Sequence, residues 1–102
     1  MEQLTINLQP QYIGKFQTII KAFGSENLFI DNFLRYHVIR LKREISRMQF
    51  ALNKYEVKYN MTSEIFYNKL ENGDLGDDRD FVMWSGIYEL LIDSKNQLSL
   101  LI

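Results

Sequence analysis

The residues best suited to metal or acid–base chemistry are four aspartates that follow an Asn-Gly pair: Asp74, Asp77, Asp78 and Asp80. A calcium-binding EF-hand loop needs oxygen ligands at alternate positions and a glutamate at its end, and this segment has neither. No neighbouring nucleophile or phosphate-binding loop would give these carboxylates a reaction to catalyse. We therefore interpret them as turn and helix-capping residues, and we expect no metal site and no cofactor here.

The chain contains one histidine, His37, and no cysteine. A single histidine without cysteine disfavours a transition-metal site and a histidine-dependent catalytic triad. The lack of cysteine also excludes a disulfide framework. We expect His37 to lie on a helix surface or at an interface, and we expect the protein not to be an enzyme.

The first nine residues alternate between apolar and polar side chains before the only proline, Pro10. Leu4, Ile6 and Leu8 form the apolar series, which is the period of a β-strand with one apolar face. A single strand needs a partner for its backbone donors and acceptors, and the same strand of a second chain would supply one. The polar face carries amides and a hydroxyl, which are groups that contact base edges in the DNA major groove.

The rest of the chain has helical spacing. Pro10 suits a first helical turn, and Gly24 and Ser25 predict a tight turn into a long second helix over roughly residues 26–59. A third helix is expected over 64–71, capped by Thr62 or Ser63, and a fourth from an Asp77 cap to about residue 98. The predicted fold class is mainly α, with one short N-terminal strand that pairs in a dimer.

The second helix has a heptad-like apolar stripe. Its members alternate by four and three residues: Leu34, Val38, Leu41, Ile45, Met48, Leu52, Tyr55 and Tyr59. This spacing favours two-stranded association of helices. The alternative is that the stripe packs on the C-terminal helices of the same chain.

Charge divides the chain. Residues 1–63 carry nine Lys/Arg and five Asp/Glu, a net +4, and residues 64–102 carry three and eight, a net −5. We predict two parts, 1–50 for dimerisation and DNA binding and 51–102 for binding a partner. No apolar run is long enough for a membrane span, and no signal peptide is evident, so we expect a cytoplasmic protein without membrane contact.

Basic residues gather on the second helix: Arg35, Arg40, Lys42, Arg43 and Arg47. A solvated helix face is one interpretation of this series. Contact with nucleic-acid phosphates is the other.

The order of strand, Pro10, helix, Gly24-Ser25 turn and second helix resembles the ribbon–helix–helix family over residues 3–45. The resemblance implies an intertwined dimer whose paired strands enter the DNA major groove. It implies base contacts by Gln3, Thr5, Asn7 and Gln9, and phosphate contacts by backbone N–H groups near Ser25, Glu26 and Asn27. It also places Leu4, Ile6 and Leu8 in the dimer core, to which the apolar stripe would add Leu34, Val38 and Leu41. The chain departs from the family in having no basic base-contacting residue, an acidic Glu26 and a second helix about twice the usual length.

The segment from Tyr59-Asn60-Met61-Thr62-Ser63-Glu64 to Phe81 and Trp84 looks like the C-terminal part of antitoxins encoded beside toxins. The resemblance implies a type II antitoxin-like protein, a dimer that neutralises a basic toxin and regulates its own operator DNA. The partner-binding residues would be Phe66, Tyr67, Phe81, Trp84 and Tyr88. The alternative function is a helical homodimeric interaction protein without DNA binding.

Overall fold

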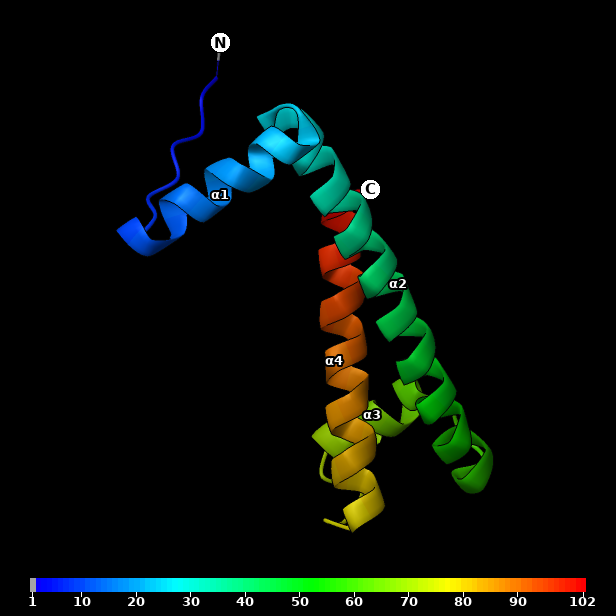
Figure 1. Cartoon of the computed structure of the whole chain (residues 1–102). Coiled ribbons are helices and arrows are strands. Elements are labelled where there is room, and N and C mark those ends of the chain that lie inside the picture. The colour runs from blue at the N-terminus through cyan, green and yellow to red at the C-terminus, as the bar shows by residue number, and fades with distance from the viewer. Residues whose placement is uncertain (1) are drawn as a thin grey trace. The chain divides into compact units, whose positions relative to one another are not determined.

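The computed structural model describes residues 2–102, which form four helices (Figure 1). They are α1 (Pro10–Phe23), α2 (Glu26–Tyr59), α3 (Ser63–Glu71) and α4 (Arg79–Leu101). The chain divides into two compact units, Met1–Tyr36 and His37–Ile102, which we call the front unit and the rear unit. The division falls inside α2, so the boundary expected between residues 50 and 51 lies within the rear unit.

The predicted N-terminal strand is wrong. Residues 2–9 contain no strand, and their side chains are all exposed, including Leu4 at 86%. The alternation defines an apolar face, but a strand also needs a neighbouring backbone, and residues 2–102 of this chain provide none. The ribbon that would have aligned Gln3, Thr5, Asn7 and Gln9 for base contacts, and Leu4, Ile6 and Leu8 for a core, is therefore absent from the described residues.

The ends of α1 and the start of α2 follow from local chemistry. Pro10 occupies the first turn of α1, where a missing N–H costs nothing. Gly24 ends α1 at a φ of 97°, and its N–H contacts the carbonyls of Ile20 and Lys21. The Ser25 Oγ then accepts a hydrogen bond from the Leu28 N–H at 3.2 Å, which caps α2.

The hydrogen bonds at the starts of α3 and α4 show which side chains cap these two helices. Thr62 caps α3, because its Oγ1 accepts from the Ile65 N–H at 3.2 Å. Asp78 caps α4 in place of the expected Asp77, and its carboxylate accepts from the Asp80 N–H at 2.9 Å. Asp78 has the extended backbone (φ −54°, ψ 145°) that a helix N-cap requires.

The core of the molecule lies in the rear unit. There α4 runs antiparallel to α2, and α3 crosses near the end of α2 (Figure 1). Leu52, Phe66, Trp84 and Leu91 form the buried cluster. The α2 stripe packs against this cluster through Ile45, Met48, Tyr55 and Tyr59. This half of the stripe is therefore occupied inside the chain, as in the second interpretation of the sequence.

Residues 2–36, the described part of the front unit, form no comparable core. No residue of α1 is buried, and the buried residues of α2, Leu41 and Leu52, belong to the rear unit. Phe29 contacts Phe16, Phe23 and Phe33 at ring-centroid distances of 5.3, 5.7 and 6.1 Å. These rings pack, but Phe16 and Phe29 are only partly buried, and Phe23 and Phe33 are exposed. Of the helices in residues 2–102, none has the length and apolar character that crossing a membrane demands.

Candidate protein-binding site

The structure separates the five aromatic residues predicted to bind a partner. Phe66 and Trp84 are fully buried, and their parallel rings stack with centroids 3.8 Å apart. Phe81 is partly buried and lies 5.6 Å from Phe66. Tyr67 and Tyr88 remain partly exposed. A partner can therefore reach the two tyrosines on the folded rear unit, whereas contact with Phe66 or Trp84 would require the core to open.

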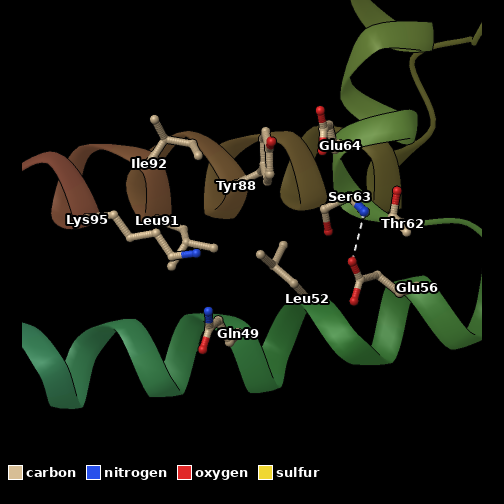
Figure 2. A pocket seen from close by; sticks show the side chains of 10 residues that line it. All are labelled: Gln49, Leu52, Glu56, Thr62, Ser63, Glu64, Tyr88, Leu91, Ile92 and Lys95. Carbon is tan, nitrogen blue, oxygen red and sulfur yellow. Dashed lines mark hydrogen bonds between the residues drawn. The ribbon is translucent and has the colours of Figure 1, made fainter.

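Ser63 joins the three helices of the rear unit. Its Oγ accepts a hydrogen bond from the Trp84 Nε1 at 2.8 Å. Its N–H donates to the Glu56 Oε2, also at 2.8 Å, and Figure 2 shows this second bond. Ser63 is the one buried polar residue among those described. The sequence identified Ser63 as an alternative helix cap, whereas its structural role is to satisfy the buried indole N–H. No local pattern reveals that role, because Trp84 lies 21 residues further along the chain.

A groove lies between α2 and α4 beside this junction. It has a volume of about 420 Å³ and is open to solvent. Gln49, Leu52 and Glu56 line it from α2, and Tyr88, Leu91, Ile92 and Lys95 line it from α4 (Figure 2). Thr62, Ser63 and Glu64 close the end nearest α3.

A second groove, of about 360 Å³, lies on the other side of Tyr88. Tyr67, Tyr88, Glu89, Ile92 and Asp93 line it. The Tyr67 hydroxyl donates a hydrogen bond to the Glu89 Oε1 at 2.6 Å, and this bond raises the pKa of Tyr67 above that of a free tyrosine. The Tyr67 and Tyr88 rings contact each other with centroids 5.2 Å apart.

The two grooves share Tyr88 and Ile92 and form one continuous surface. We call it the Tyr88 face and define it by the residues Tyr67, Tyr88, Ile92, Glu56, Glu64, Glu89 and Asp93. Its grooves are lined by four carboxylates and one cation, Lys95. A surface of this composition suits apolar and cationic side chains of another protein, because aromatic rings contact both kinds and carboxylates attract the cations.

The residues that line the grooves of the Tyr88 face include no histidine and no cysteine. Among residues 2–102, no three acidic or histidine side chains lie close enough to hold a metal ion.

Asp80, one of the four aspartates, has a structural role. Its Oδ2 accepts hydrogen bonds from the Lys58 Nζ at 2.7 Å and from the Tyr59 hydroxyl at 2.6 Å. These bonds lower the pKa of Asp80 and raise the pKa values of Lys58 and Tyr59. Asp80 therefore links the start of α4 to the end of α2, while Asp74 and Asp77 are exposed in the connecting turn.

The predicted DNA-binding residues do not form a shaped site. Gln3, Thr5 and Asn7 are exposed on non-helical chain. Gln9 accepts a hydrogen bond from the Gln11 Nε2 at 2.9 Å, and Ser25 is used in capping α2. Asn27 is exposed in the first turn of α2.

The predicted dimer-core residues differ in burial. Leu34 is exposed, Val38 is partly buried, and Leu41 is fully buried in the rear unit. Comparisons of the sequence and the structure with models of protein families, with curated proteins and with solved structures give no match.

Proposed function

We propose that this chain is an antitoxin-like protein that neutralises a basic partner protein by covering it with the Tyr88 face. Of the residues that the resemblance implies for partner binding, the Tyr88 face keeps Tyr67 and Tyr88 and adds Ile92 and four carboxylates. The observation that carries it is the Tyr88 face itself, an acidic and aromatic surface with two adjoining grooves. The interaction we propose takes place in the cytoplasm.

Two properties of the Tyr88 face support a protein partner over a small molecule. Its two grooves are only partly enclosed, whereas ligand sites usually enclose most of the ligand. Tyrosine is among the residues that contribute most to interface affinity, and Tyr67 and Tyr88 are held side by side by the Glu89 hydrogen bond and by their ring contact. Carboxylates around them would steer a basic protein toward the surface.

The test is co-expression of the full chain with the protein encoded by the adjacent gene. We expect the two proteins to co-purify as a complex, and we expect the chain to relieve any growth arrest that the neighbour causes. The double variant Glu89→Lys/Asp93→Lys should weaken the complex at least tenfold, because it replaces two attractive charges by two repulsive ones. The dissociation constant can be measured by isothermal titration calorimetry.

The matched control is Asp74→Lys/Asp77→Lys, which makes the same change of net charge in the turn before α4, away from the Tyr88 face. It should keep most of the affinity. Equal losses in the two variants would show that overall charge, not the Tyr88 face, determines binding. If the protein encoded by the adjacent gene forms no complex with the unaltered chain, the proposal is wrong.

A second candidate function, homodimerisation, is favoured by the front unit. A mainly apolar groove of about 700 Å³ there is lined by apolar residues that include Ile6, Leu8, Ile13, Phe16 and Ile20. The front unit carries three Lys/Arg and three Asp/Glu, so two copies would not repel each other. Sedimentation equilibrium should give a dimer that Phe16→Asp dissociates and Gln11→Asp preserves. A monomer at all concentrations would exclude homodimerisation.

A further inference from the structure

The solvent side of α2 in the rear unit carries a regular series of cations. Its members are Arg40, Arg43, Arg47, Lys54 and Lys58. Successive residues of an α-helix are rotated by about 100°, so these five side chains fall within an arc of about 60°. They extend over about 27 Å of helix at 1.5 Å per residue. We call this surface the cationic stripe.

The centre of the cationic stripe points away from the buried residues of α2, while Arg47, Lys54 and Lys58 also line grooves along the flank of α2 that α4 borders. Leu41 and Leu52, the buried residues of α2, lie about 140° around the helix from its centre. All five cations are exposed. Lys42, in contrast, is exposed on the same helix but lies about 100° from Arg43 and outside the stripe.

Few carboxylates of the rear unit neutralise the cationic stripe. Arg40 pairs with Glu44 at 3.3 Å and Lys58 with Asp80 at 2.7 Å. Within residues 2–102, Arg43, Arg47 and Lys54 form no ion pair. Three cations at the middle of the stripe thus keep their full charge for a ligand.

An exposed aromatic ring lies among these three cations. Phe50 is 67% exposed, and the Lys54 Nζ lies 5.0 Å from its ring centroid. An exposed phenylalanine between cations offers a flat surface on which a sugar or an unpaired base can stack. Along the chain, the acidic residues of the rear unit other than Glu44 follow from Glu56 onward.

We propose that the cationic stripe binds the phosphodiester backbone of nucleic acid. A series of cations along one side of a straight helix matches the closely spaced phosphates of nucleic acid, which bind Lys and Arg by releasing counterions. The cationic stripe does not depend on an N-terminal strand and shares no residue with the Tyr88 face. The binding is sequence-independent, because the stripe offers charge and few groups that distinguish bases.

The test measures fluorescence anisotropy of two labelled probes, a duplex DNA of about two helical turns and a single-stranded RNA of equal charge, with the full chain and increasing salt. Contact by the three unpaired cations predicts a slope of log K against log salt of about −2.7 on duplex DNA. The affinity should then fall about 40-fold between 50 and 200 mM salt. Binding of either probe supports a phosphodiester ligand, and their ratio identifies which nucleic acid is preferred.

The decisive variant is Arg43→Gln/Arg47→Gln. It should weaken binding at least tenfold and reduce the magnitude of the slope by about 1.8, because two phosphate contacts are lost. Its matched control, Lys42→Gln/Lys69→Gln, removes two positive charges outside the stripe and should bind nearly as well as the unaltered chain. Circular dichroism confirms that both variants fold, since glutamine is a good helix former.

Three results would overturn the proposal. The first is no binding of either probe at 50 mM salt. The second is an equal loss of affinity in the two double variants, which would assign binding to net charge. The third is binding of poly-glutamate but of neither nucleic acid, which would assign the cationic stripe to an acidic protein partner.

Discussion

The front and rear units are both made of amphipathic helices rich in aromatic residues, yet only the rear unit buries any of them. The front unit gathers Phe16, Phe23, Phe29 and Phe33 at edge-to-face or stacked distances without burying a ring. The rear unit buries Phe66 and Trp84 completely, because α3 and α4 both close over the end of α2. A core therefore forms where three helices pack together, and aromatic content alone does not produce one.

The largest effect we expect is a difference in the loss of stability between one substitution in the rear unit and one in the front unit. Trp84→Ala should cost about 3–5 kcal/mol of the free energy of unfolding or unfold the rear unit outright, because it leaves a cavity against Phe66. Tyr12→Ala, at a position 52% exposed in α1, should change the free energy of unfolding by less than about 0.5 kcal/mol. Urea unfolding followed by far-UV circular dichroism measures both. Similar losses in the two variants would contradict the contrast.

A smaller effect tests the polar centre of the rear core. Ser63→Ala removes the acceptor of the Trp84 N–H and should cost about 1–3 kcal/mol, because a buried donor is left without a partner. Ser99→Ala is the control, since the Ser99 hydroxyl bonds only to a carbonyl of its own helix on an exposed surface. Thermal unfolding should separate the two variants clearly. A Ser63→Ala protein as stable as the Ser99→Ala protein would show that the hydrogen bond contributes little.

The smallest expected effect is a dependence of rear-unit stability on acidic pH. The pKa of Asp80 is lowered by the hydrogen bond from Lys58, so its ionised form is favoured in the folded state. The resulting stability is present above the pKa of an unfolded aspartate, about 3.9, and is lost as the pH falls through the lower folded value. The Tm difference between the unaltered chain and Asp80→Asn should therefore shrink below about pH 4. Asp74→Asn, in the exposed turn, should show no such trend.

Sequence patterns predict where the helices begin and end, but they do not predict which elements pack against each other. Proline, glycine and capping residues act over a few positions, so the start of α1 at Pro10 and the turn at Gly24 follow from local rules. The predicted N-terminal strand is wrong, because the alternation of apolar and polar residues in one segment does not supply a second strand for it to pair with. Phe66 and Tyr67 are neighbours in the sequence, yet Phe66 is buried and Tyr67 is partly exposed. One helical step of about 100° turns the second side chain away from the core.

The candidate site was predicted only in part, for a related reason. Tyr67 and Tyr88 could be chosen as aromatic residues near acidic ones, but their contact and the grooves beside them depend on how α3 packs on α4. The role of Ser63 depends on Trp84, which lies 21 residues further along the chain. Long-range pairings of this kind have no periodic signature in a single sequence.

The most direct test of this account is amide hydrogen exchange of the full chain at low and at high protein concentration. We predict that at low concentration α1 exchanges rapidly, while the amides of α2 near Leu52 and those of α3 and α4 are protected, because only the rear unit has a core. Raising the concentration should increase protection in α1 alone, as a second copy covers its apolar side. Protection of α1 equal to that of α4 in the dilute monomer would contradict the account.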